Sequence, residues 1–412
     1  MERNLGSLVD EAARAAPYEF FKRIRTEKPV YRLPGSDVYL ITTHELIKTV
    51  VRDIKTFSNE LPQGQTAHHN SSSAADRVLQ EKGFGRRIKT IANHDPPGHY
   101  AFRRLMSGIL SPTIIQGMEA RVREDAQRLL DAIDTSQPCD VVEAVTLPLP
   151  LLVISDLLGV ERSDFQTFKI WAAASLYQNK PPQTEEALVR DAELIAEMQH
   201  YLVGVMNDRR KNPRDDTVTR LVNAKLNDER LLTEKEILSI LELFILAGAE
   251  TTTNAMGNSL IYFIDNPSAE QAVREASGRM ADVVEELLRL ESSVTGIWRS
   301  VTCDTVLDGV PITAGSKLIL AYGPSNWDEA IFDEPRQFVL DRPNIKDHFA
   351  FGSGIHVCLG NSLARLELKV MLEQWFTTFS KFKLAIDRSQ IAYQPFMTLR
   401  GPTSLPLSLE RH

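Results

Sequence analysis

The chain has 412 residues, of which 43% are hydrophobic and 25% are charged, and its formal net charge is −8. These proportions are typical of a globular protein, and the acidic balance excludes a general nucleic-acid binder. The three cysteines, Cys139, Cys303 and Cys358, have no metal-finger spacing, and an odd number fits no complete disulfide framework. We therefore expect a protein of the reducing cytoplasm.

The first predicted elements are two short strands within residues 30–42, joined by a turn at Pro34 and Gly35. The polar stretch that follows, residues 59–87, is expected to be a mobile surface loop. It contains His68 and His69, which are expected to be solvated because no third metal ligand lies nearby. Mostly helical patterns then cover residues 118–210, with a break at residues 181–186. The loop and the break are expected to form a movable mouth of the site.

A long helix is predicted to begin at a capping box formed by Thr233 and Glu236 and to end before Pro267. At roughly 30 residues it would be about 45 Å long. Its most apolar run reads ILSILELFILAGA, contains Ser239 and Glu242, and is too short to span a bilayer, so we expect no membrane association. Its centre reads AGAETTT, and these residue types are poor choices for the middle of a buried helix.

A further helix contains ADVVEELLRLE, and short strands are predicted between residues 301 and 320, around turns at Asp308–Gly309 and Ala314–Gly315. A strong helix is then predicted over residues 359–379. No linker or repeat divides the chain. The pattern as a whole predicts a mainly α protein with small β-sheets.

The loop before this last helix reads FGSGIHVCLG, residues 351–360. Gly352 and Gly354 allow a tight turn there, and Cys358 would lie at the helix N-terminus, where the helix dipole favours a thiolate. Such a thiolate could be a nucleophile, a redox thiol or a metal ligand. Because no resolving cysteine or paired histidine is close, a ligand is favoured, and a buried structural cysteine is the alternative.

This loop resembles the haem-binding signature of the cytochrome P450 monooxygenases at Phe351, Gly352, Gly354, His356, Cys358 and Gly360. Three further motifs follow the family's order along nearly the whole chain. The sequence AGAETT resembles the family's oxygen-activation motif, EELLR resembles its Glu-x-x-Arg pair, and DPPGHYAFRRL resembles the helix that meets the haem propionates. The resemblance implies the cytochrome P450 fold, with a long central helix over the haem, as a single haem domain over residues 1–412 without a fused reductase.

The resemblance also implies a cofactor, haem b (iron protoporphyrin IX), with Cys358 as the iron ligand. Glu250 and Thr251 would be the catalytic pair, Glu250 relaying protons from solvent and Thr251 donating a hydrogen bond during oxygen activation. The alternative for Thr251 is a hydrogen bond back to the preceding helical turn. The residues that would contact the haem are His99, Arg103, Ala247, Gly248, Arg299, Phe351, Gly352 and His356.

Glu286 and Arg289 lie three residues apart, hence on one helix face, and by resemblance have a structural role. The family usually adds a third, basic partner from a stretch that here reads DEPRQF, and the matching position is Gln337. In addition, Trp327 stands where the family usually has an arginine.

The residues at the family's substrate-contact positions are mostly apolar: Phe244, Ala247, Val294, Thr295, Ile297, Trp298, Phe396 and Met397. With Thr295 and Thr398 as hydrogen-bonding points, they predict a hydrophobic small molecule, such as a terpenoid, an aromatic or a steroid-like compound. No cation lies among these positions, which argues against fatty acids.

The expected partners, besides O2 and the substrate, are a separate ferredoxin and a ferredoxin reductase, because no GxGxxG fingerprint follows the haem motifs. Positive charge for docking would come from Arg103, Arg104, Arg365 and Lys369, and the protein is expected to be a monomer. One alternative is a peroxygenase that uses hydrogen peroxide, which the Glu250–Thr251 pair disfavours. The other is a non-catalytic haem sensor or carrier, for which a signalling domain would be expected.

Overall fold

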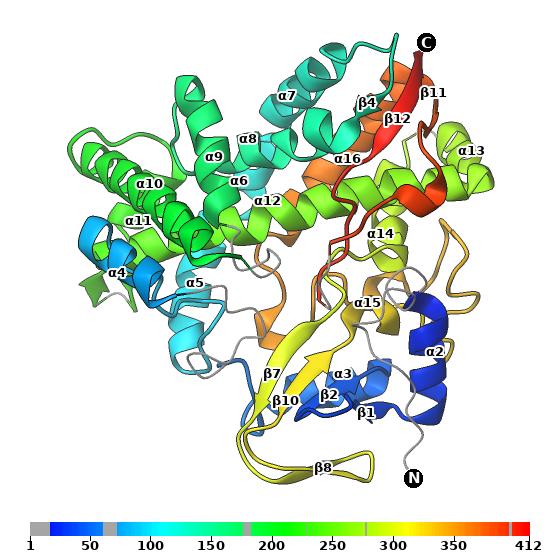
Figure 1. The fold of residues 1–412 in the computed structure, drawn as a ribbon, viewed down its shortest axis with the longest axis horizontal. Coiled ribbons are helices and arrows are strands. Elements are labelled where there is room, and N and C mark those ends of the chain that lie inside the picture. The colour runs from blue at the N-terminus through cyan, green and yellow to red at the C-terminus, as the bar shows by residue number, and fades with distance from the viewer. Residues whose placement is uncertain (1–16, 61–71, 176–182, 228, 277, 395–397) are drawn as a thin grey trace. The chain divides into compact units, whose positions relative to one another are not determined.

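The computed structural model describes residues 17–60, 72–175, 183–227, 229–276, 278–394 and 398–412. These residues belong to two compact units. Unit 1 comprises Met1–Leu61, Ala126–Thr146 and Thr251–His412, and unit 2 comprises Pro62–Asp125 and Leu147–Glu250. Helices predominate in both and the sheets are small, which confirms the predicted fold class (Figure 1).

Unit 1 contains a five-stranded sheet with the order β1-β2-β10-β7-β3. Strands β1 and β2 are antiparallel and flank the predicted turn at Pro34 and Gly35, so this hairpin is confirmed. Strand β10 pairs in parallel with β2 and antiparallel with β7. The strands are β1 (Val30–Arg32), β2 (Val38–Ile41), β3 (Phe57–Ser58), β7 (Ile297–Val301) and β10 (Lys317–Leu320).

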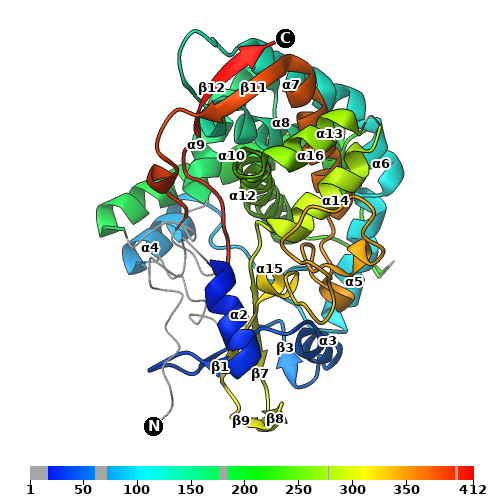
Figure 2. The same ribbon diagram turned by 90° about the vertical axis from the view of Figure 1, so that its right-hand side faces the viewer.

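Helices α2 (Pro17–Glu27) and α3 (His44–Arg52) cover opposite faces of this sheet (Figure 2). Successive side chains of a strand point to opposite faces. Accordingly, Leu318 and Leu320 of β10 pack in one cluster with Ile47 of α3, whereas Ile319 packs in another with Ile24 of α2. Because β10 has apolar side chains on both of its faces, one helix packs against each face of the sheet.

The rest of unit 1 carries the C-terminal motifs. Helix α14 (Met280–Leu290) contacts α16 (Asn361–Thr378), and strands β8 (Thr305–Leu307) and β9 (Val310–Ile312) form the predicted hairpin at Asp308 and Gly309. Both turn residues have positive φ, 50° and 74°, as a tight hairpin of this kind requires. The remaining elements are β4 (Cys139–Asp140), the π-helical turn Val142–Thr146, α13 (Pro267–Glu275), α15 (Tyr322–Ser325), β11 (Phe379–Leu384) and β12 (Pro406–Arg411).

Unit 2 is built around α10 (Glu185–Lys211), which contacts α4 (Ser73–Lys82), α9 (Phe165–Ser175) and α11 (Thr217–Val222). Helix α4 corrects the prediction of a loop over residues 59–87. Its N-cap is Ser72, whose hydroxyl accepts a hydrogen bond from the Ala75 amide at 3.1 Å, and its Ala75 and Leu79 are buried. His68, His69, Pro181 and Pro182 lie outside the described residues. The other elements are α5 (Gly98–Ile109), α6 (Pro112–Gly117), α8 (Pro148–Leu157), β5 (Lys225–Leu226) and β6 (Arg230–Leu231). Helix α7 (Glu119–Asp131) has residues in both units.

Helix α12 (Glu234–Asp265) is the predicted long helix, with 32 residues and a length of about 48 Å. The capping box is confirmed, since the Glu236 amide donates to Thr233 Oγ1 at 3.2 Å and the Thr233 amide donates to Glu236 Oε2 at 2.8 Å. Arg230 also donates to both carboxylate oxygens of Glu236, and these bonds lower the pKa of Glu236 to about 2. Within the described ranges, no helix is long and apolar enough to cross a membrane.

Candidate functional site

Cys358 lies in a turn between the 3-10 turn Gly354–His356 and α16, and the residue is exposed. Its amide donates a hydrogen bond to the Phe351 carbonyl at 2.8 Å, and the Asn361 side chain donates to its carbonyl at 2.5 Å. The backbone on both sides of the cysteine is therefore held in place by hydrogen bonds, and the residue is exposed.

The two glycines of this turn are required by conformation and by space. Gly352 and Gly354 have φ values of 70° and 72°, in the left-handed region that favours glycine. A Cβ on Gly352 would lie 3.2 Å from Tyr322 Cε2, and a Cβ on Gly354 would lie 3.3 Å from the Val51 carbonyl oxygen. The turn can thus pack closely on α15 and α3 only with glycine at both positions.

Tyr322 also connects the cysteine turn to Arg299, another predicted haem contact. Burial raises the pKa of Tyr322, whereas the charge of Arg299 and a hydrogen bond between the two side chains lower it. Arg299 lies on β7, is itself buried, and donates to the Trp298 carbonyl at 2.8 Å. Unit 1 therefore brings a buried cation close to the turn that contains Phe351, Gly352, His356 and Cys358.

Unit 2 holds the other two predicted propionate contacts on α5. His99 and Arg103 lie one helical turn apart, His99 buried and Arg103 partly exposed. Burial and the neighbouring charge of Arg103 lower the pKa of His99. A neutral imidazole presents one donor and one acceptor beside a permanent cation, a pair suited to binding a carboxylate.

The predicted catalytic pair lies near the middle of α12. Glu250 is 8% exposed and Thr251 is partly buried, while Ala247, one turn earlier, is exposed. Gly248 has a packing function of its own, because a Cβ there would lie 2.6 Å from Ile154 Cδ1 of α8. The haem contacts of Ala247 and Gly248 and the roles of Glu250 and Thr251 stay predictions.

Glu286 and Arg289 form a fully buried ion pair with two hydrogen bonds of 2.8 Å each. Their third charged partner is Arg342, whose Nε lies 3.1 Å and 3.3 Å from the two Glu286 carboxylate oxygens. Gln337, the position that the motif comparison pointed to, contributes its main-chain carbonyl, which accepts from Arg289 at 3.3 Å and from Arg342 at 3.1 Å. The basic partner that the matching position 337 lacks is therefore Arg342, five positions further along the chain.

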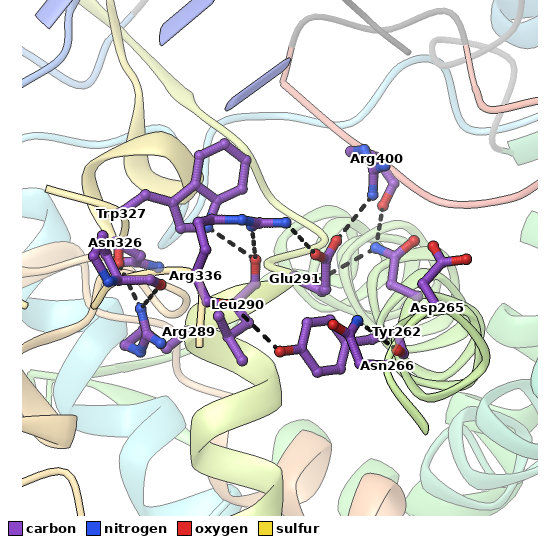
Figure 3. A network of polar contacts seen from close by, with 12 residues as sticks. Tyr262, Asp265, Asn266, Arg289, Leu290, Glu291, Asn326, Trp327, Arg336 and Arg400 are labelled. Carbon is purple, nitrogen blue, oxygen red and sulfur yellow. Dashed lines mark hydrogen bonds and ion pairs between the residues drawn. The ribbon is translucent and has the colours of Figure 1, made fainter. Parts of the chain in front are cut away.

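Trp327 and Arg336 complement each other beside this ion pair (Figure 3). The guanidinium of Arg336 lies over the Trp327 ring at 4.5 Å from its centroid and 3.3 Å from Glu291 Oε1. The Trp327 indole donates to the Leu290 carbonyl at 2.9 Å. A tryptophan at position 327 thus gives the adjacent arginine a stacking partner, in a network that continues from Glu291 to Arg400 at 3.1 Å.

A second network, which the sequence motifs did not indicate, supports the cysteine turn. Glu285 accepts hydrogen bonds from His348 at 3.0 Å and from Arg365, and the Arg365 guanidinium lies 4.4 Å from the centroid of the Phe351 ring. Burial raises the pKa of Glu285, but the bonds from His348 and Arg365 outweigh it and hold the pKa at about 2. An acidic residue directly before the Glu-x-x-Arg motif was the only sequence signal for this network.

The predicted substrate contacts of unit 1 lie partly exposed near β7. The Thr295 amide donates to the Thr398 carbonyl at 2.9 Å, so the two predicted hydrogen-bonding threonines are adjacent. Val294, Ile297 and Trp298 are partly buried, as is Phe244 on α12. Phe396 and Met397 lie outside the described residues.

The family model described as Cytochrome P450 matches residues 5–405 of the chain. The chain belongs to the cytochrome P450 family. It is 29% identical over 399 residues to Cytochrome P450(MEG) of Priestia megaterium, covering 96% of this chain and 95% of the relative. It is 28% identical over 387 residues to Linalool 8-monooxygenase of Pseudomonas putida, covering 93% of this chain and 94% of the relative. The solved structure of Cytochrome P450 CYP109Q5 from Chondromyces apiculatus is 29% identical, with a TM-score of 0.85 over 98% of both chains.

Membership of the cytochrome P450 family implies a haem-iron cofactor, and the donor groups of this chain fit one. An exposed thiol on a turn fixed by its backbone suits an axial iron ligand. The buried Arg299 near that turn and the His99–Arg103 pair of α5 offer cations and a hydrogen-bonding imidazole, which the two propionates of haem need.

Proposed function

We propose that this cytochrome P450 inserts one oxygen atom from O2 into a hydrophobic small molecule, using electrons from a separate ferredoxin and ferredoxin reductase. The observation that carries the proposal is Cys358, which is exposed on a hydrogen-bonded turn at the start of α16. Glu250 and Thr251 lie near the middle of the 32-residue helix α12. An iron ligand and a proton-delivering pair are both needed for oxygen activation, whereas a haem carrier needs only the ligand.

Haem, when bound, supplies the oxygen-activating and electron-accepting chemistry, which side chains alone cannot provide. Cys358 would hold the iron as a thiolate and increase its electron density, tuned by the main-chain amides of the turn. As the family resemblance implies, Arg299 and His356 in unit 1 are candidate propionate ligands, and so are His99 and Arg103 in unit 2.

Glu250 and Thr251 would control proton delivery. A carboxylic acid at position 250 would take a proton from solvent on one oxygen and release it from the other toward the site. The Thr251 hydroxyl would donate a hydrogen bond there and hold a water molecule in place, so that protons reach the oxygen atom that leaves as water. The apolar side chains near β7 would position the substrate and exclude bulk water.

A terpenoid is the first substrate to test. The apolar Val294, Ile297 and Trp298, with the Thr295 hydroxyl nearby, suit a hydrocarbon skeleton with one polar group, and a relative of this chain bears the name Linalool 8-monooxygenase. Linalool should therefore be titrated into the ferric holoprotein and followed by the absorbance change as iron-bound water is displaced.

The oxygenase proposal is tested through Thr251→Ala, with Thr252→Ala as the matched control on the same helix. The purified variants would be supplied with a ferredoxin, its reductase, O2 and saturating substrate, and product and hydrogen peroxide would be measured per reduced nicotinamide. We expect Thr251→Ala to make less product and more peroxide, and Thr252→Ala to match the wild type. Equal coupling in all three proteins would contradict the role of Thr251. Full turnover with hydrogen peroxide alone would instead favour a peroxygenase.

The iron ligand is tested by spectroscopy alone. Reduced holoprotein with carbon monoxide should show the red-shifted Soret band of thiolate ligation, and Cys358→His should move it to the position of imidazole-ligated haem. Cys303→Ser is the control, because Cys303 is also exposed and should leave the band unchanged. A Cys358→His spectrum identical to the wild type would refute the assignment.

The electron-transfer partner is tested with Arg104→Glu. Arg365 is a poor probe, because it is paired with Glu285 and stacked on Phe351, and Lys369 lies 3.7 Å from Glu373. Arg104 is exposed on α5, so its charge can be reversed without breaking these contacts. We expect slower reduction by ferredoxin in this variant and a rate that falls with added salt. A reduction rate that neither salt nor the substitution changes would argue against a charged docking face.

A further inference from the structure

A cavity of about 130 Å³ lies within unit 2. It is lined by α10, α12, the end of α9, and the turn that follows α4, and it is partly open to the outside. This volume is comparable to that of a cavity that holds one small organic ring, so the cavity can hold the head group of a substrate. Both apolar and polar side chains line it: Leu79, Arg87, Ile195, Gln199, Glu242 and Leu246.

Glu242 is the most unusual residue of this cavity, because it is a carboxyl group that is only 5% exposed. Its Oε1 accepts a hydrogen bond from Gln199 Nε2 at 2.6 Å, but its Oε2 has no hydrogen-bond partner among the described residues. Gln199 cannot supply the second bond, since it also donates to the Gly85 carbonyl at 2.9 Å and accepts from the Phe84 amide at 2.7 Å. A buried polar atom without a hydrogen-bond partner is unfavourable, so a ligand group that bonds to it would bind favourably.

We propose that this cavity is a subsite for a carboxylate of the substrate, which would accept hydrogen bonds from Glu242 and from Arg87. The inference rests on the proposed function in that it assigns the bound molecule as the oxidised substrate. The substrate would then be amphipathic, with a carboxylate at one end and an apolar body.

The charges around the cavity favour an anion over a cation. Burial raises the pKa of Glu242, so its carboxyl group is held in the neutral form that can donate a hydrogen bond. Arg87 lies close enough to act electrostatically on Glu242, and within the described residues it forms no ion pair of its own. Lys235, which donates to the Gly85 carbonyl at 3.0 Å, adds a second positive charge that also acts on Glu242. An ammonium group would meet both cations, whereas a carboxylate would be attracted by both.

Glu242 lies on the same helix as the predicted catalytic pair. Glu242 and Glu250 are eight residues apart on one continuous helix, a separation of about 12 Å along its axis. Between them lie Leu246, which lines the cavity, and the exposed Ala247. A carboxylate bound at Glu242 would therefore leave an apolar chain to extend along α12. The substrate contacts predicted from the sequence include no cation, which argues against fatty acids as substrates. Arg87, in the turn after α4, supplies such a cation.

Binding to the ferric holoprotein, measured by isothermal titration calorimetry, tests the proposal. The probes are dodecanoate, 1-dodecanol and dodecyltrimethylammonium, which share a chain length and differ in the head group. We expect dodecanoate to bind most tightly. Arg87→Gln and Glu242→Leu should each weaken it about tenfold or more, as loss of a hydrogen bond to a charged group implies. Glu242→Gln, which keeps a donor of the same shape, should bind dodecanoate within about threefold of the wild type.

Two controls keep the result specific. Arg77→Gln changes an exposed arginine of α4 that does not line the cavity, and it should leave dodecanoate binding unchanged. Binding of 1-dodecanol should be similar in all variants. The proposal is overturned if dodecyltrimethylammonium binds best and Glu242→Gln abolishes that binding, since Glu242 would then be an ionised anchor for cations. It is equally overturned if no substitution affects dodecanoate, since the cavity would then hold only water. Calorimetry needs neither electrons nor O2, so failure here is distinct from failure of the Thr251→Ala coupling test.

Discussion

Replacing Glu367 with glutamine should make the stability of the protein less dependent on pH. Glu367 lies on α16, is only 2% exposed, and its Oε2 has no hydrogen-bond partner among the described residues. Burial raises its pKa from 4.5 to about 8. The folded protein therefore holds a proton at position 367 at neutral pH, while the unfolded chain releases it.

The size of the effect follows from these two pKa values. Between about pH 4.5 and about pH 8 the folded state binds one proton more than the unfolded state, so the free energy of unfolding falls by about 1.4 kcal/mol per pH unit. From about pH 5.5 to about pH 7.5, this residue alone should lower the stability by roughly 2.7 kcal/mol. Glutamine has nearly the same shape and does not titrate, so the variant should lack this loss.

Urea unfolding of the holoprotein, followed by far-UV circular dichroism at several pH values, measures the difference. The advantage of Glu367→Gln over the wild type should grow with pH by the amount given above. Glu373→Gln is the control, because Glu373 lies on the same helix, is partly exposed, and has Lys369 at 3.7 Å. Equal pH slopes for Glu367→Gln and the wild type would show that Glu367 is ionised in the folded protein, and the reasoning would fail.

Three further predictions concern the contacts that support the site. Arg342→Gln should lower the free energy of unfolding by about 3–5 kcal/mol, because it leaves the buried Glu286 carboxylate with one cation fewer. Gln337→Ala should lower it by less than about 1 kcal/mol, because only the main chain of Gln337 takes part. Similar urea midpoints for the two variants would contradict the assignment of Arg342. Glu285→Gln should lower the free energy of unfolding by up to about 3 kcal/mol near neutral pH. In the wild type this contribution is present above about pH 4.5 and is lost as the pH falls toward about 2. The free energies of unfolding of wild type and variant should therefore converge in acid. Gly248→Ala should destabilise the protein by about 1–3 kcal/mol through its clash with Ile154, and Ile154→Ala should cost less in the Gly248→Ala background than in the wild type; additive losses would mean that the two residues do not touch.

Local patterns in the sequence were enough to predict the main elements. The capping box at Thr233 and Glu236 and Pro267 beyond the last turn set the limits of α12, because both act within one or two helical turns. The turn at Asp308 and Gly309 set the β8–β9 hairpin for the same reason. The stretch 59–87 is the exception, because its polar residues predict a surface loop and the structure has helix α4 there. Helix α4 has few apolar residues, and burial of its Ala75 and Leu79 stabilises it. This burial cannot be recognised in a stretch of sequence that is mostly polar.

The motif residues were also visible in the sequence, because each motif is short and continuous. FGSGIHVCLG identified Cys358 and the two glycines, and the structure adds the reason for them: positive φ and close approach to Tyr322 and Val51. A motif can indicate that a glycine is required at a position. Only the folded structure shows which neighbouring atoms a larger residue at that position would clash with.

Only the tertiary structure determined which residues complete these motifs. Arg342 reaches Glu286 from 56 residues away, and Arg365 reaches Glu285 from 80. Glu242 likewise depends on Gln199, 43 residues earlier, for its one hydrogen bond. Hydrogen bonds and ion pairs of buried charges act over a few ångströms, and any segment that folding brings within that distance can supply them. Short motifs in the sequence therefore indicate the family and its candidate site residues, because each motif is continuous. Folding sets which buried charges are paired, which are held neutral, and which carboxylate oxygens have no hydrogen-bond partner among the described residues.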